Sequence, residues 1–272
     1  MQSCRNNNKL KVTATRLSFG ILIATFSINA WSLSASSNKS IDIVPSVQPV
    51  KTMADNGDAE AQYFLGRQYR DGKGVIKNLS KAMELLTNAA EQGFAPAQID
   101  LGQMYSNGMG VEPSDKIAAG WFKKAADQNF PTAQFNLANM YRSGNGVAKD
   151  IDKAFIYYEK AALNGFVKAQ FNLALMHYYG LGTKKDLGKV IFWYEKAASN
   201  DFHRAQYHLA NMYSEGEGVQ KNYEQAYIWM SKASKGGIQE AFEEVKILKA
   251  LMDAEKQKKS DPSIIGSEFA AH

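Results

Sequence analysis

The sequence is poor in the residues that build disulfides, zinc sites and hydrolase active sites. Its only cysteine is Cys4, so no disulfide can form within the chain and no cysteine-based zinc site is available. Among its four histidines, His203 and His208 are five residues apart, which places them about 140° apart around a helix. No Gly-x-Ser-x-Gly motif of a serine nucleophile occurs. These absences count against a disulfide scaffold, a zinc enzyme and a serine hydrolase.

Long apolar runs are also missing, and the one candidate lies near the start of the chain. Four basic residues and no acidic one accompany an apolar segment from Leu17 to about Ala30, and small residues follow it. This segment is shorter than the ~20 apolar residues that a membrane-spanning helix needs. We therefore expect residues 1–35 to be a secretory signal peptide, with an uncleaved anchor as the alternative. A periplasmic or secreted bacterial protein without a membrane span after cleavage is the expected result.

The positive charge of the chain belongs mostly to this leader. The formal net charge is +5, and four of these charges lie in the leader, which leaves about +1 on residues 36–272. The sequence pI near 9.0 is therefore a property of the leader. A nucleic-acid-binding domain would need a basic patch of its own, so we expect no nucleic-acid partner.

A pattern repeats every 36 residues along most of the chain, which indicates a solenoid. Its first part has an alanine, a leucine four residues later and a tyrosine four residues after that, as in Ala133, Leu137 and Tyr141. This spacing puts all three side chains on one face of a helix, here called helix A. The tyrosine position holds His177 in the fourth repeat, which we interpret as a packed ring.

The second part of the pattern predicts a turn and then a second helix, called helix B. A Gly-x-Gly pair, such as Gly144 and Gly146, supplies the left-handed conformations that end helix A. Five good N-cap residues follow at one position of the repeat: Asn78, Ser114, Asp150, Asp186 and Asn222. Residues that tolerate the left-handed conformation mark the end of each helix B: Gly57, Gly93, Asn129, Gly165, Asp201 and Gly237.

An Ala-Gln-x-x-Leu-Gly/Ala-x-x-Tyr helix, a Gly-x-Gly-Val turn and a Lys-Ala-x-x-Trp-Tyr-x-Lys-Ala-Ala helix together resemble the Sel-one-like repeat (SLR) family, a cousin of the tetratricopeptide repeats. The resemblance covers about residues 54–245. It implies that similar exported bacterial members act as adaptors, in envelope regulation, assembly or host contact. One branch of the family is rich in disulfides and includes proteins that bind or hydrolyse β-lactams, and a chain without disulfides does not resemble it.

The predicted fold is all-α, a right-handed α/α solenoid of five helix-turn-helix repeats with capping helices at both ends. A linker (36–48) leads into a solenoid over 49–258, which starts with a short helix from Pro49 to Asn56. The repeats are expected at about 54–89, 90–125, 126–161, 162–197 and 198–233, followed by a C-terminal cap at 234–258 and a disordered tail at 259–272. In the cap, Lys246 and Lys249 replace packing residues because no further repeat follows.

The side of helix A that points away from helix B is the predicted binding surface, a concave groove. Its candidate residues come from three positions of the repeat: Tyr63, Arg67, Arg70, Gln103, Phe135, Asn139, Arg142, Phe171, Leu175, Tyr178, Tyr207 and Asn211. The three arginines could bind carboxylates of a partner, and Phe171, Leu175 and Tyr178 would form an apolar part. The alternatives are that the aromatic position packs between repeats and that the two variable positions are merely solvated.

We therefore expect a monomeric, non-catalytic scaffold that binds a protein or an extended peptide and needs no cofactor or metal. Two other functions stay open. One is an enzyme of the β-lactam-binding kind. The other is a cell-wall glycan binder, which aromatic residues of helix B could support. These residues are Trp121, Tyr157, Tyr158, Trp193, Tyr194 and Trp229. Core packing is the preferred interpretation of them.

Overall fold

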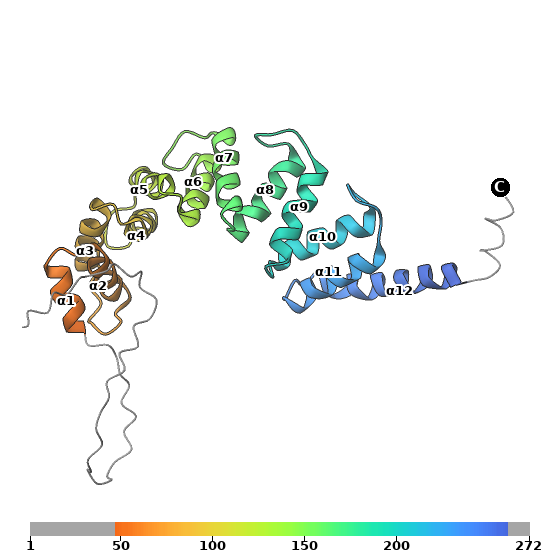
Figure 1. The fold of residues 1–272 in the computed structure, drawn as a ribbon, viewed down its shortest axis with the longest axis horizontal. Helices are drawn as coiled ribbons and strands as arrows, with labels where there is room; N and C mark the ends of the chain where they lie inside the picture. Colours follow the sequence, from red (N-terminus) through yellow and green to blue (C-terminus); the bar gives the residue numbers. More distant parts are fainter. Residues whose placement is uncertain (1–46, 261–272) are drawn as a thin grey trace, which may run out of the picture. The chain divides into compact units, whose positions relative to one another are not determined.

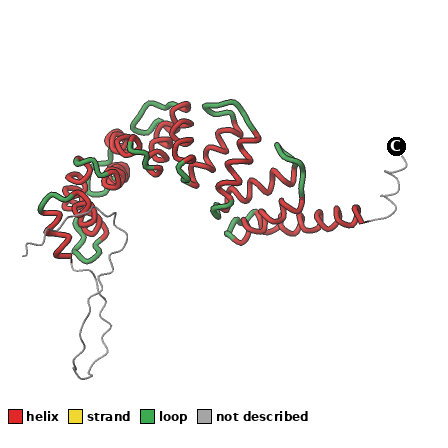
Figure 2. The backbone as a smooth tube through the Cα atoms, in the orientation of Figure 1, coloured by secondary structure: helices red, strands yellow, loops and turns green. Residues whose placement is uncertain are grey.

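The computed structural model describes residues 47–260, with side chains over 49–258, and this part of the chain contains helices and loops but no strand (Figure 2). The helices are α1 (Val47–Asp55), α2 (Ala59–Asp71), α3 (Leu79–Glu91), α4 (Ala95–Asn107), α5 (Asp115–Asp127), α6 (Pro131–Ser143), α7 (Ile151–Leu163), α8 (Val167–Tyr179), α9 (Leu187–Ala198), α10 (His203–Glu215), α11 (Tyr223–Lys235) and α12 (Ala241–Ser260). The predicted signal peptide, most of the predicted linker and most of the predicted tail lie outside the described residues.

Each helix packs against the helix before it and the helix after it in the chain, as can be followed from α1 to α12 in Figure 1. The even-numbered helices are the predicted A helices, and the odd-numbered helices are the B helices. Five A–B hairpins follow one another from α2–α3 to α10–α11, which confirms the predicted all-α repeat fold. Over residues 47–260, no helix is both long and apolar enough to cross a membrane.

The predicted helix ends are confirmed. The side chains of Asn78, Ser114, Asp150, Asp186 and Asn222 each accept a hydrogen bond from the backbone N–H three residues later, at the start of a B helix. A glycine in the left-handed conformation ends each A helix from α2 to α10. After the B helices, even the two non-glycine residues, Asn129 and Asp201, have positive φ, at 64° and 55°.

The core follows the alanine and leucine positions of the repeat. The five leucines of the A helices are at most 1% exposed: Leu65, Leu101, Leu137, Leu173 and Leu209. The six aromatic residues of the B helices named in the sequence analysis are buried or half-buried, as the core-packing interpretation predicts, whereas Phe192 of α9 is exposed. At the C-terminal end, Leu248 of α12 is buried, whereas Lys246 and Lys249 are exposed. The last helix thus covers α11 with one face and presents charges on another.

A buried glutamine joins each A helix from α2 to α10 to the B helix before it. The Nε2 atoms of these glutamines donate to a backbone carbonyl eight residues earlier, near the end of that B helix, with donor–acceptor distances of 3.0–3.5 Å. They are Gln62, Gln98, Gln134, Gln170 and Gln206. Each of these carbonyls also accepts a hydrogen bond from the backbone N–H three residues later, so the glutamine provides a second hydrogen bond to it and ties the two helices together.

In the first three repeats, the same glutamine also binds the end of its own B helix. Gln92 donates to Gln62 at 2.8 Å, Gln128 donates to Gln98 at 3.0 Å, and Asn164 donates to Gln134 at 3.2 Å. In the fourth repeat, Asn200 instead donates to a carbonyl of its own helix, and the Oε1 atom of Gln170 is buried without a partner among the described residues. This glutamine relay therefore connects α1, α3, α5 and α7 and ends there.

His177 lies in the core at the position where the other repeats have tyrosine. It is buried, it meets Phe155 edge-on at 5.4 Å between ring centroids, and its Nδ1 atom has no partner in the described part of the chain. Burial lowers the pKa of His177, and the positive charge of Lys189 lowers it further, against the opposite effect of Asp186 and Glu159. The ring is therefore neutral in the folded protein at neutral pH.

We expect the fold to lose stability as the pH falls below about 6.5, and part of this loss to come from His177. Below that pH the histidine binds a proton in the unfolded chain but not in the folded chain. This difference lowers the free energy of unfolding by at most about 1.4 kcal/mol per pH unit for one histidine. The substitution His177→Tyr should make the free energy of unfolding less dependent on pH between 7 and 5, as measured by urea denaturation. An unchanged pH dependence in this variant would contradict the prediction.

Candidate partner-binding face

The aromatic position of the predicted groove packs between consecutive repeats. Rings at this position contact the phenylalanine that precedes the next A helix, with centroid distances of 4.9–5.2 Å for Tyr63–Phe94, Phe135–Phe166 and Phe171–Phe202. Tyr63 and Phe171 are buried, whereas Phe135 is half-buried. Tyr207 is half-buried, and its hydroxyl donates to Glu244 of α12 at 3.0 Å. These four side chains thus belong largely to the joints between repeats.

The other predicted groove residues lie nearer the surface. Arg67 and Arg142 are exposed, and the half-buried residues are Arg70, Gln103, Asn139, Leu175, Tyr178 and Asn211. Five of them line two surface clefts, which lie between successive A helices. We call these clefts the α4–α6 socket and the α8–α10 socket.

The two sockets occupy the same position of the repeat, two repeats apart. The α4–α6 socket has a volume of about 390 Å³ and is lined by Gln103, Ser106, Asn107, Asp115, Phe122, Asn136, Asn139, Met140, Ser143 and Asn145. The α8–α10 socket has a volume of about 220 Å³ and is lined by Leu175, Tyr178, Tyr179, Tyr194, His208, Asn211, Met212, Glu215 and Glu217. Each residue of the second set follows a residue of the first set by 72 positions, so the repeat itself generates both clefts.

Arginines of the chain occupy the same position at the two other joints between A helices. Between α2 and α4, Arg70 Nη1 lies 2.8 Å from Asp100 Oδ2, and Arg67 Nε lies 3.5 Å from the same oxygen. Between α6 and α8, Arg142 Nε donates to the Tyr158 hydroxyl at 3.2 Å, and this hydroxyl donates to Asn139. The three arginines that we expected to bind a partner's carboxylates therefore already have partners within the chain.

Asp100 depends on this arginine pair. Burial raises the pKa of its carboxyl, and the charges of Arg70 and Arg67 act in the opposite direction. Both Arg70 and Asp100 are largely buried at the side chain, with exposed fractions of 15% and 14%. The pair is thus better shielded from solvent than an ordinary surface ion pair.

We expect Arg70→Met to lower the free energy of unfolding by about 1–3 kcal/mol at neutral pH, because it leaves the Asp100 carboxylate without its closest cation. A second substitution, Asp100→Asn, should restore part of this loss. The matched control is Lys246→Met, which breaks an exposed pair with Glu243 and should change stability by less than about 1 kcal/mol. Equal denaturation curves for the two single variants would contradict the structural role of Arg70.

The α8–α10 socket has aromatic walls and acidic residues. Tyr194 stacks on His208 at 5.5 Å with an interplanar angle of 9°, and Tyr178 meets Tyr179 edge-on at 5.0 Å. The Tyr178 hydroxyl donates to Glu217 at 3.3 Å. Burial lowers the pKa of His208, and the nearby charge of Arg204 acts in the same direction, so the ring is neutral at neutral pH.

Sequence reasoning missed Tyr179, Tyr194, His208, Glu215 and Glu217 as socket residues. It assigned Tyr194 to the core, and the side chain is indeed only 3% exposed, but the residue also lines the socket. The repeat pattern marks the Tyr194 position as aromatic, because Phe122 and Tyr158 hold the same position in the two preceding B helices.

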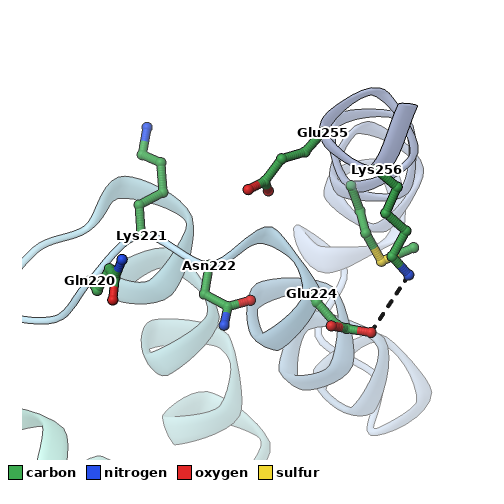
Figure 3. Close-up of a pocket in the computed structure, with 7 residues that line it drawn as sticks. Gln220, Lys221, Asn222, Glu224, Glu255 and Lys256 are labelled. Carbon is green, nitrogen blue, oxygen red and sulfur yellow. Dashed lines mark ion pairs between the residues drawn. The ribbon is translucent and has the colours of Figure 1, made fainter. Parts of the chain in front are cut away.

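A further cleft of about 280 Å³ lies where α12 packs near the start of α11 (Figure 3). It is lined by Gln220, Lys221, Asn222, Glu224, Met252, Glu255 and Lys256. Glu224 and Lys256 form an ion pair across it at 3.6 Å. The cleft carries charges of both signs and has no counterpart on the A helices. Over residues 49–258, no three His, Cys, Asp or Glu side chains gather in a group that could hold a metal ion.

The geometry defines a helical-repeat protein with a repeated cleft on its A helices. Five consecutive segments match the Sel1 repeat model, at residues 59–94, 95–130, 131–166, 167–202 and 203–238. The chain belongs to the Sel1 repeat family, which confirms the resemblance seen in the sequence. The repeats of the family model begin with helix A, five residues after the boundaries used in the sequence analysis.

A solved structure of the family shares the fold, and a second one is similar in sequence. A Sel1 repeat protein from Oxalobacter formigenes is 30% identical with a TM-score of 0.67, over 74% of this chain and 81% of that chain. The protein c5321, a protective antigen of uropathogenic Escherichia coli with an SLR fold, is 32% identical with a TM-score of 0.48. That match covers 72% of this chain and half (50%) of the antigen's chain. A search among curated proteins found no match.

Proposed function

We propose that this protein is a non-catalytic scaffold that binds an extended segment of a partner protein along its A helices. The observation that carries this proposal is the repeated socket. Two clefts at the same repeat position can bind two side chains of one segment that lies across the A helices. The two sockets have the same architecture and different linings: the α4–α6 socket is mainly polar with one carboxylate, Asp115, and the α8–α10 socket is aromatic with two, Glu215 and Glu217. They can therefore recognise different side chains.

The place of action that we propose is the periplasm or the exterior of a bacterial cell. The support for it comes from the basic residues before Leu17 and the short apolar segment that follows. N-terminal sequencing of the protein purified from the bacterial envelope tests this part. A start near residue 36 is expected, and a start that retains Arg5 would instead indicate a membrane anchor.

Partner binding can be tested in cells with a photo-crosslinking amino acid at single positions. Ser106 and Tyr179 are exposed and line the two sockets, whereas Lys123 and Lys160 are exposed on B helices. We expect the same partner to be crosslinked from Ser106 and Tyr179, and not from Lys123 or Lys160. Crosslinks from the B-helix positions alone would place the partner on the other side and overturn the proposal.

A further inference from the structure

The repeat places an arginine of the chain at two of the four joints between the A helices α2, α4, α6, α8 and α10. Arg70 and Arg142 hold the same repeat position, and the α8–α10 socket has Tyr178 there instead. At the α2–α4 and α6–α8 joints, an arginine of the chain occupies this position. At the α8–α10 joint, the same position is an open cleft with a volume of about 220 Å³. The other repeats of the chain thus indicate which kind of side chain the α8–α10 socket can bind.

The Tyr194 hydroxyl is a binding group left without its usual partners. In the preceding repeat, the equivalent Tyr158 hydroxyl is held by Arg142 and Asn139. Here Tyr178 and Leu175 stand in place of that arginine and asparagine. Tyr194 is 3% exposed, the Leu175 side chain has no hydrogen-bonding group, and the Tyr178 hydroxyl donates to Glu217 instead. A guanidinium that entered the socket would supply the missing donor.

The socket walls also suit a cation. Tyr178 and Tyr179 provide aromatic rings, and a guanidinium within about 6 Å of a ring face is attracted by it. Glu215 and Glu217 add two carboxylates, whereas Ser143 and Asn145 hold the same positions in the α4–α6 socket. A planar guanidinium can stack on a ring and donate to a carboxylate at the same time.

The chain's own Lys185 shows that a cation is accepted at the rim. Its Nζ atom lies 4.7 Å from the centroid of the Tyr178 ring and 3.8 Å from Glu217 Oε1. The Lys185 side chain is 53% exposed, and such surface pairs contribute about 0–1 kcal/mol. A partner's cation can therefore displace it at little cost.

We infer that the α8–α10 socket binds an arginine side chain of the partner segment, with its guanidinium against Tyr178 and Tyr194 and its charge balanced by Glu215 and Glu217. This inference rests on the proposed function, because the arginine is presented by the segment that crosses the A helices. It also names the ligand chemistry of one socket, which the proposed function leaves open.

The test uses random dodecapeptides displayed on phage and selected against the full chain without its leader. We expect the enriched peptides to contain arginine. A synthetic enriched peptide in which citrulline replaces that arginine keeps the shape and loses the charge, and it should bind at least tenfold more weakly by fluorescence polarisation. The double variant Glu215→Gln/Glu217→Gln should lose this preference for arginine over citrulline. Tyr194→Phe, which removes only the hydroxyl, should reduce it.

The matched control is Ser143→Ala/Asn145→Ala, which changes the same positions in the α4–α6 socket and should keep the preference. Melting curves of all variants show whether they are folded. Enriched peptides without arginine, or a preference that survives in the glutamine double variant, would overturn this inference and leave the proposed function standing. Failure to enrich any peptide would overturn both.

Discussion

Replacing Leu137 with alanine should lower the free energy of unfolding by about 2–5 kcal/mol, the usual cost for a fully buried leucine. Leu137 is 1% exposed and packs in a cluster with Ala118 and Phe122 of α5 and Ala133 of its own helix. The substitution leaves a cavity that rigid neighbouring helices cannot fill. Urea denaturation followed by circular dichroism measures the loss.

The same chemical change at a surface position is the control for this prediction. Leu163 lies at the end of α7 and is 70% exposed, so Leu163→Ala should change stability by less than about 0.5 kcal/mol. If both leucine variants unfold at the same urea concentration, the assignment of the Leu137 face to the core is wrong.

Gly146→Ala should lower the free energy of unfolding by about 2–5 kcal/mol, from about 1–2 kcal/mol of left-handed strain and about 1–3 kcal/mol of overpacking. Gly146 has a φ of +69°, and a Cβ atom there would come into steric conflict with backbone atoms of Asp115 and Lys116. Backbone cannot rotate aside as a side chain can. The turn after α6 would therefore have to move away from the start of α5.

Gly165→Ala separates these two contributions. Gly165 also has a positive φ, +82°, but a Cβ atom there would meet nothing within 4 Å. This variant should lose only the strain component, about 1–2 kcal/mol. Equal losses for the two alanine variants, measured by thermal denaturation, would show that the contact between the Gly146 turn and α5 is not tight.

Most of the fold was predictable because its signals are local and occur five times. An N-cap such as Asn78 bonds a backbone N–H three residues away, and a glycine such as Gly72 ends a helix through its own φ. Neither depends on distant parts of the chain. The period of 36 residues then sets which helix packs on which, since every repeat must bury the same face.

The binding face was predicted less well, because its contacts join residues that are distant in sequence. Arg70 looks free in the sequence, but its partner Asp100 lies 30 residues later on the next A helix. Whether an arginine is used within the chain depends on the residue facing it, and the periodic pattern does not encode that choice. The sockets were partly found: Gln103, Asn139, Leu175, Tyr178 and Asn211 do line them.

The end of the glutamine relay at the fourth repeat has a mechanical consequence. In stacked repeats, stability depends on the coupling between neighbours, and a weaker coupling divides an array into blocks that open separately. Here the relay holds α1 to α7 together, and the joint beyond Gln170 lacks one of its bonds. The α8–α10 socket bridges that joint, so a segment bound there would fasten the two blocks to each other. Partner binding would then add a connection between helices where the glutamine relay ends.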